Sequence, residues 1–384
     1  MKILYHHRTA SRDGQSTHIE EMVKAMRSLG HTVEIVAPAV DDSDQTGGSG
    51  GWAGQLKRLL PKPVYEFLEL VYSVVAYRRL ARAIKAFKPD FIYERYNLFL
   101  LAGAWARKRF GVPLVLEVNA PMALERRQYG GLSLGWLADW AEHFVWRSAD
   151  TVLPVSQVLA DHIQGTGVPA ERLVVVPNGI NPEDYANLPS REEAKARLGL
   201  SGRLVIGFTG FVREWDRLDR VVAWLARYDG PQRLHLLVVG DGPARVEIES
   251  CAAACGISDR VSFTGVISRG QVPAAASAFD VALQTALVPY ASPLCLFEYL
   301  ALGIATVAPD QPNHHEIVTG DSSAVLYEPE DPTGLERAIE KLCRDADFRQ
   351  AIARAGQQLI AEKHLTWQEH ARHVVQLATA LVKR

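Results

Sequence analysis

Hydrophobic residues along the chain fall into short runs that alternate with longer segments of helical periodicity. Residues 3–5 form the first run. The segment after it repeats apolar side chains at helical spacing from Ile19 to Leu29, with Gly30 as its stop. The further strands predicted in this half are residues 33–37, 91–93, 114–118 and 151–155. Apolar strands alternating with helices of this length are typical of a parallel sheet covered on both faces.

A second series of the same kind follows residues 177–200, and its predicted strands are residues 204–208, 235–239, 261–263, 281–283 and 306–308. We therefore predict an α/β protein with two doubly wound Rossmann-like domains, residues 1–180 and 181–365, facing each other across a cleft. A last helix, within residues 366–384, is expected to pack back onto the first domain. Open parallel sheets bind ligands at the carboxyl ends of their strands, so such a cleft suits a substrate in two parts.

Charge, cysteine content and hydropathy exclude several classes of protein. A formal net charge of −2 argues against nucleic-acid binding, which usually needs a basic face. The four cysteines show no metal-ligand spacing; we interpret Cys251 and Cys255 as small buried apolar side chains, with a redox or metal role as the alternative. The N-terminal residues do not read as a secretory signal, and no run reaches the roughly 18 apolar residues of a spanning helix. We expect a reduced, cytoplasmic protein.

Residues 281–310 carry the most informative pattern. A strand leads through a loop to Pro293, which opens a helix that ends near Gly303. The start of that helix offers unpaired N–H groups and the positive end of a dipole, which suit a pyrophosphate. Glu298 then has two interpretations, a complement to the helix dipole or an acceptor of hydrogen bonds from two ribose hydroxyls. The turn at residues 240–243 (GDGP) is a weaker signal, read either as a plain turn or as a loop facing a nucleotide.

Sequence blocks of a known family run along nearly the whole chain. They are ILYHHRT (3–9), Gly14 and His18, GHTVEIVAP (30–38), LEVNAP (116–121), VLPVS (152–156), VVPNGINPEDY (175–185), VVGDGPA (238–244), RVSFTGVI (260–267), AFDVALQ (278–284), SPLCLFEYLALG (292–303) and VAPDQPNHHE (307–316). In this order they resemble the retaining glycosyltransferases of family 4, on the GT-B fold, and within it a bacterial subgroup that builds polysaccharides and glycoconjugates.

The resemblance implies a donor site for a nucleotide-diphosphate sugar in the second domain and acceptor binding in the first. Glu298 matches the second glutamate of the E-x7-E motif, which holds the donor ribose. The other implied donor residues lie in loops and at a helix start. They are Gly14 and Gln15 over the phosphates, Gly265, Val266 and Ile267 at the nucleobase, and Ser292, Pro293, Leu294, Cys295 and Leu296 at the pyrophosphate and sugar.

Three positions depart from the family pattern. Tyr290 stands where the first glutamate of the motif belongs, and Cys295 stands where similar sequences place a lysine. We expect Cys295 to reshape the pocket for an unusual donor sugar; the alternatives are a donor site that is merely weakened and a thiol that points into the domain core. After Gly210, Phe211 and Asp216 occupy the usual cationic places.

Two arginines are the available replacements for the missing cations. Arg213 and Arg217 follow Gly210 in the same loop, and solvated charges at a helix start are the alternative interpretation. The resemblance and these departures lead us to predict Asn119, Arg213 and Tyr290 as catalytic groups, and His18, Glu94 and Asn119 on the acceptor side.

The predicted reaction transfers a hexose with retention at the anomeric carbon. No convincing DxD motif is present, so we predict no metal and no cofactor beyond the sugar nucleotide. The acceptor is expected to be a glycan, a lipid-linked sugar or a small molecule. Two alternatives stay open: a non-catalytic binder that has lost its chemistry at Tyr290, Cys295 and Asp216, or a sugar-nucleotide epimerase.

Residues 56–88 mix apolar and basic side chains. One interpretation is two helices with ordinary core faces and solvated charges. The other is a membrane-surface patch that brings the protein to a lipid-linked acceptor at the inner membrane surface.

Overall fold

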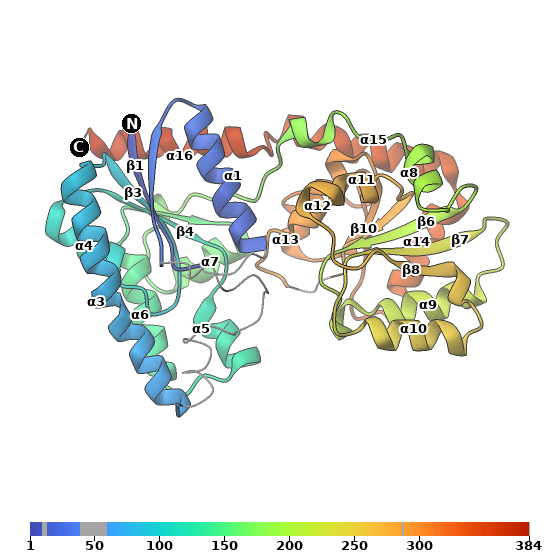
Figure 1. The fold of residues 1–384 in the computed structure, drawn as a ribbon, viewed down its shortest axis with the longest axis horizontal. Coiled ribbons are helices and arrows are strands. Elements are labelled where there is room, and N and C mark those ends of the chain that lie inside the picture. Colours follow the sequence, from blue (N-terminus) through green and yellow to red (C-terminus); the bar gives the residue numbers. More distant parts are fainter. Residues whose placement is uncertain (10–13, 39–59, 286–287, 384) are drawn as a thin grey trace. The chain divides into compact units, whose positions relative to one another are not determined.

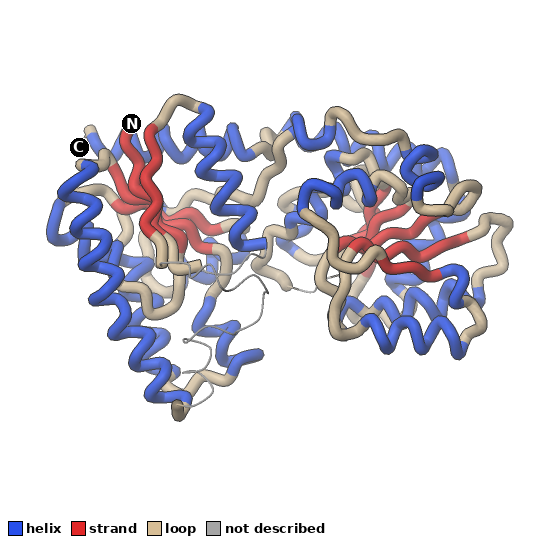
Figure 2. The backbone as a smooth tube through the Cα atoms, viewed as in Figure 1, coloured by secondary structure: helices blue, strands red, loops and turns tan. Residues whose placement is uncertain are grey.

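The computed structural model describes residues 1–9, 14–38, 60–285 and 288–383. The chain folds into two compact units, Met1–Pro177 with Trp367–Arg384, and Asn178–Thr366 (Figure 1). Each unit has one parallel sheet with helices on both faces (Figure 2). This architecture confirms the predicted fold class.

The first unit contains a five-stranded sheet in the order β2-β1-β3-β4-β5. Its strands are β1 (Lys2–His6), β2 (Thr32–Val36), β3 (Phe91–Arg95), β4 (Leu114–Val118) and β5 (Thr151–Pro154). Its helices are α1 (Gly14–Ser28), α3 (Lys62–Phe87), α4 (Ala102–Phe110), α5 (Met122–Glu125), α6 (Gly135–Ser148), α7 (Gln157–Gly165) and α16 (Trp367–Val382), with short helical turns η1 (Arg126–Gly130) and η2 (Ala170–Arg172).

The last helix, α16, packs against α1 of the first unit (Figure 1). Its buried residues Trp367, Ala371, Val374 and Ala378 recur at helical spacing and form one stripe. The Trp367 ring meets the His18 ring edge to face, with 4.6 Å between the ring centroids. Helix α16 therefore holds the part of α1 that carries His18.

The second unit contains a six-stranded sheet in the order β11-β10-β9-β6-β7-β8. Its strands are β6 (Leu204–Thr209), β7 (Leu234–Val239), β8 (Val261–Phe263), β9 (Val281–Leu283), β10 (Ala305–Pro309) and β11 (Val325–Tyr327). Its helices are α8 (Arg191–Arg197), α9 (Leu218–Arg227), α10 (Arg245–Ala254), α11 (Val272–Ala276), α12 (Leu294–Ala301), α13 (Pro312–His315), α14 (Gly334–Arg344) and α15 (Ala346–Glu362), with turns η3 (Pro182–Tyr185), η4 (Glu214–Asp216), η5 (Ser258–Arg260) and η6 (Arg269–Gln271).

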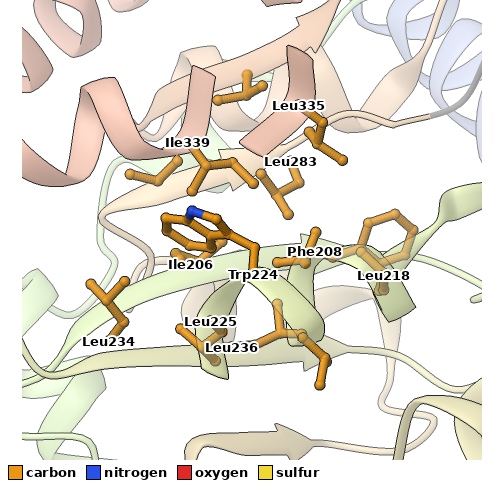
Figure 3. Packing of buried hydrophobic residues seen from close by; sticks show 14 of the residues in the cluster. Ile206, Phe208, Leu218, Trp224, Leu225, Leu234, Leu236, Leu283, Leu335 and Ile339 are labelled. Atoms are coloured by element: carbon orange, nitrogen blue, oxygen red, sulfur yellow. The ribbon is translucent and has the colours of Figure 1, made fainter. Parts of the chain in front are cut away.

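A large apolar cluster fills one face of this second sheet. Figure 3 shows Trp224 of α9 among aliphatic side chains of the strands and Ile339 of α14. Because such side chains interdigitate at close-packed density, the cluster fixes α9 and α14 against the sheet. Within the described residues, no helix is long and apolar enough to cross a bilayer.

Gly207 in β6 leaves room for a neighbouring ring, so we expect Gly207→Ala to destabilise the second unit. An added Cβ would lie 2.1 Å from the Phe279 ring, and overpacking of this kind costs about 1–3 kcal/mol. Gly270→Ala is the matched control, because a Cβ there meets nothing within 4 Å. Urea unfolding of both variants tests the prediction, and equal midpoints would contradict it.

Candidate functional site

The loops after β6 and β7 touch through their backbones. Gly240 has φ +146°, and a Cβ there would lie 2.0 Å from the carbonyl oxygen of Gly210. This close approach alone explains a glycine at the start of the 240–243 turn. The structure therefore favours the plain-turn interpretation of that motif.

Asp216 closes the loop that follows β6. Its carboxylate accepts a hydrogen bond from the Arg213 backbone N–H at 2.8 Å and one from the Thr285 hydroxyl at 3.4 Å. Burial raises the pKa of Asp216, and these hydrogen bonds oppose the rise. Asp216 thus acts as a structural cap of this loop.

Arg213 and Arg217 line the same cavity, of about 430 Å³, beside the starts of α9 and α10. The Arg213 guanidinium lies 4.9 Å from the ring centroid of Trp215, and Arg217 lies 3.4 Å from the Asp219 carboxylate. Three carboxylates also line this cavity, those of Glu214, Asp219 and Glu247. The structure brings the two predicted cations together, in surroundings that partly neutralise them.

The start of α12 has no side-chain cap and no acidic residue in its first turn. Pro293 precedes it, and Leu296 is buried beneath it. The Ser292 hydroxyl accepts a hydrogen bond from the Asn178 N–H at 3.0 Å, and the Asn178 amide donates to the Ser292 carbonyl. Ser292 therefore anchors the loop before the helix, while the backbone at Leu294 forms the first turn.

Cys295 points toward the end of β6. Its sulfur lies 3.3 Å from the carbonyl oxygen of Thr209, and its side chain packs against a buried cluster that includes Tyr299. Burial, with a further effect of Glu298, raises the pKa of Cys295 to about 12. The reshaped sugar pocket stays a prediction, and the direction of this thiol argues against it.

Glu298 forms an ion pair with Arg269, a residue that sequence reasoning missed. Glu298 is 4% exposed, whereas the Arg269 side chain is 54% exposed. Burial raises the pKa of Glu298, and the charge and hydrogen bond of Arg269 oppose this. Dipole effects fade beyond the first turn, and Glu298 is the fifth residue of α12, so the dipole interpretation is the weaker one.

The loop predicted to meet the nucleobase leads directly into η6, which carries Arg269. Gly265 has φ +69°, the Val266 side chain is exposed, and Ile267 packs against the same buried cluster as Cys295; Arg269, two residues further on, is paired with Glu298. The structure therefore places this loop, the start of α12 and Glu298 in one neighbourhood. The sequence held one indication of the partner of Glu298, the single cation Arg269 just after this loop.

Tyr290 lies in the turn between β9 and α12. The Asn313 side chain donates hydrogen bonds to the carbonyls of Val288 at 3.0 Å and Ala291 at 2.8 Å, which fixes the backbone on both sides of Tyr290. Sequence reasoning missed Asn313 as well.

In the first unit, the buried carboxylate of Glu117 gathers side chains from several elements. The hydroxyl of Tyr93 donates to it at 2.8 Å, and the Asn119 amide donates at 2.5 Å. Arg95 forms an ion pair with it, and His18 Nδ1 lies 3.4 Å away. The structure thus brings the predicted residues Asn119 and His18 together around a carboxylate that was not predicted.

The charge states of Glu117 and His18 follow from burial together with the partners of each side chain. Burial would raise the pKa of Glu117, but His18, Arg95 and the hydrogen bonds outweigh it and lower the pKa. Burial also lowers the pKa of His18 to about 4, with Glu117 opposing. His18 is therefore neutral near neutral pH, and Arg95 is the cation that keeps Glu117 ionised.

Glu94, predicted on the acceptor side, is fully buried. Its Oε2 lies 2.5 Å from His6 Nδ1, so Glu94 positions the His6 ring, and its place on the acceptor side stays a prediction. Gly14 and Gln15 begin α1, but their side chains lie outside what the structure describes.

Comparisons with known proteins agree on one family. Residues 13–179 match the family described as glycosyl transferase 4-like domain, and residues 190–359 match glycosyl transferases group 1. The chain is 28% identical over 279 residues to a 2-deoxystreptamine glucosyltransferase of Streptomyces kanamyceticus, which covers 69% of this chain and 70% of that protein.

Two further similarities cover more of the chain. The alpha-monoglucosyldiacylglycerol synthase of Streptococcus pneumoniae is 21% identical over 332 residues, 82% of this chain and 72% of that protein. The structure of Anabaena HepE in complex with UDP-glucose aligns with a TM-score of 0.75 at 19% identity, over 99% of this chain and 100% of that one.

The position of Cys295 predicts an unreactive thiol. With a pKa of about 12, about one thiol in ten thousand is ionised at pH 8, and the thiolate is the nucleophile. We expect iodoacetamide at pH 8 to modify the exposed Cys255 at least about 100-fold faster than Cys295. Peptide mass spectrometry measures both rates. Rapid modification of Cys295 in the folded protein would show that its sulfur faces solvent.

Proposed function

The chain belongs to family 4 of the glycosyltransferases, on the GT-B fold, and from this premise we propose that its donor is a uridine-diphosphate hexose held by the second unit. The family reaction moves a sugar from a nucleotide-diphosphate sugar with retention at the anomeric carbon. Uridine and a hexose are supported by the UDP-glucose complex of HepE and by the glucosyltransferase from Streptomyces kanamyceticus.

The main support for a donor site in the second unit is the buried carboxylate of Glu298. It lies deeper than the first turn of α12, its partner Arg269 is half-exposed, and the loop of Gly265 to Ile267 lies alongside. A carboxylate in such a place accepts strong hydrogen bonds from hydroxyl groups. In the proposal, Glu298 holds the ribose and the neighbouring loop receives the base.

The proposed chemistry depends on charge stabilisation at the leaving diphosphate. As the bond from the anomeric carbon to the phosphate oxygen breaks, negative charge grows on the phosphate. The uncapped N–H groups at the start of α12 and the Arg213 guanidinium stabilise that charge, which lowers the barrier because the interaction is strongest in the transition state. Asn119 and Tyr290 are proposed near the transferred sugar. The proposal requires no divalent cation.

We expect Glu298→Gln to weaken UDP binding about 10-fold to 100-fold, because charge-assisted hydrogen bonds are worth roughly 1.5–3 kcal/mol. Titration calorimetry with UDP measures this, and Glu330→Gln, an exposed carboxylate of the same unit, is the control. Unchanged affinity would remove Glu298 from the donor site.

A parallel assay of UDP-glucose turnover in the presence of a chelator tests the reaction itself. Binding without any release of UDP in the presence of candidate acceptors would favour the non-catalytic binder. Conversion of the donor sugar without an acceptor would favour the epimerase.

For the acceptor, we propose that α3 contacts a membrane surface from the cytoplasmic side. The first half of α3 is inverted: its buried side carries Glu66, Glu69 and Ser73, while its outer side is apolar. Phe67 is 54% exposed. The other exposed apolar residues of this face are Val64, Leu68, Val71, Val74 and Val75. The interpretation of this segment as ordinary core-facing helices is wrong for residues 62–76.

Neighbouring residues extend this surface. Glu66 accepts the backbone N–H groups of Ser133 and Leu134, which brings the start of α6 to α3, and Trp136 there is exposed. The second half of α3 carries exposed Arg78, Arg82 and Lys85. Apolar and aromatic side chains beside cations suit an anionic lipid surface. A lipid acceptor is also named for the pneumococcal relative.

We expect the protein to sediment with phosphatidylglycerol vesicles, and the double variant Phe67→Asp, Val71→Asp to bind them at least about tenfold more weakly, since two apolar contacts become anionic. Val246→Asp, which changes an exposed valine of the second unit, is the control. Vesicle binding that is absent in the unmodified protein, or equal in both variants, would contradict the membrane contact. Capture of a protein partner by the same face, without vesicle binding, would also contradict it.

A further inference from the structure

A small pocket lies in the first unit where β1 ends against α3. Its lining is basic, aromatic and apolar, and includes His6, His7, Arg8, Tyr72, Arg79 and Leu100. Its volume is about 10 Å³, enough for one oxygen atom. No carboxylate belongs to the lining in the part of the chain that the structure describes.

Positive charge exceeds negative charge around this pocket. Arg8 lies 3.3 Å from the Glu69 carboxylate, and Arg126 donates two hydrogen bonds to that same carboxylate, at 2.5 and 2.9 Å. Arg79 forms no ion pair with any described residue. Counted over the described residues, the two lining arginines and Arg126 behind them carry three positive charges against the one carboxylate of Glu69.

The remaining titratable groups do not cancel this excess. Glu94 is bound to His6 as a separate pair, with 2.5 Å between Oε2 and Nδ1. Burial, with smaller effects of His6 and Arg95, lowers the pKa of His7 to about 4, so His7 is neutral near neutral pH. Among the residues that the structure describes, the pocket is therefore a cationic site without a counter-ion of its own.

Arg8 presents a hydrogen-bond donor that has no acceptor. Its Nη1 is buried and has no partner among the described residues. The guanidinium is held in place by Glu69 on one side and by the Tyr72 ring, 5.0 Å from its centroid. A fixed donor of this kind is already oriented for a ligand, so little freedom is lost when one binds.

We infer that Arg8 and Arg79 bind a phosphate group of the acceptor. Guanidinium groups match the oxygens of a phosphate, and a phosphate monoester carries about the charge that the pocket lacks. One phosphate oxygen enters the pocket and accepts from Arg8 Nη1, while Arg79 meets the others at its mouth. The inference rests on the proposed function, in which the first unit takes the acceptor.

Two probes separate the two sources of such a phosphate. Glycerol 3-phosphate represents a soluble acceptor, and vesicles of phosphatidic acid in phosphatidylcholine represent a lipid. Binding is measured by calorimetry or by sedimentation, each at ionic strength matched with sodium chloride. The variants are Arg79→Gln and Arg8→Gln, and Arg109→Gln, an exposed arginine of α4, is the control.

We expect Arg79→Gln to weaken binding of at least one probe tenfold or more, with Arg109→Gln unchanged. Loss for glycerol 3-phosphate assigns a soluble acceptor, and loss for vesicles alone assigns a lipid phosphate. If Arg79→Gln and Arg109→Gln behave alike with both probes, the pocket does not bind phosphate. Arg79→Gln keeps the test valid if Arg8→Gln fails to fold. UDP affinity is expected to stay unchanged in every variant; a protein that never binds UDP contradicts the donor proposal instead.

Discussion

A buried carboxylate needs a cation or N–H donors close by. This constraint arranges the segments at the carboxyl ends of the strands in each of the two units. Glu298 is matched by Arg269, and Glu117 is matched by Arg95. Asp216 is matched by a backbone N–H of its own loop. The first two pairings join segments from different strands, and the third closes the loop after β6 on itself, so each of them fixes backbone near the carboxyl ends of the strands.

The same constraint explains the unusual orientation of α3. Glu66 and Glu69 face inward because they have partners on that side. Glu66 accepts hydrogen bonds from the N–H groups of Ser133 and Leu134, and Glu69 accepts one from the Arg126 guanidinium. Since these partners fix the polar side inward, the apolar residues between them are left on the outside. An inward acidic face and an outward apolar face are thus two consequences of one set of contacts, and a helix with this inversion needs something other than water on its outer side.

The sequence could predict what depends on local pattern. The predicted strands lie close to their observed bounds, and so do the helix that follows Pro293 and the last helix. Strands buried on both faces appear in the sequence as short apolar runs, and helices appear as apolar residues at helical spacing. Strand β11 was not among the predicted strands. The partner of Glu298 was also missed: Arg269 is 29 residues away, and the pairing follows from packing rather than from spacing. The inversion of α3 was missed for the same reason, because the partners of Glu69 and Glu66 lie 57 to 68 residues away along the chain.

The pairing of Glu298 with Arg269 also bears on how a ribose could use that carboxylate. Glu298 cannot turn to water, because it is buried, whereas Arg269 is half-exposed and can regain hydration when it leaves. Exchange of the guanidinium for two ribose hydroxyls therefore places most of the movement on Arg269. Removal of a partner from a buried charge is costly unless another partner replaces it at once. In the proposed donor complex, Arg269 is thus the partner that offsets the buried charge of Glu298 until the ribose hydroxyls replace it.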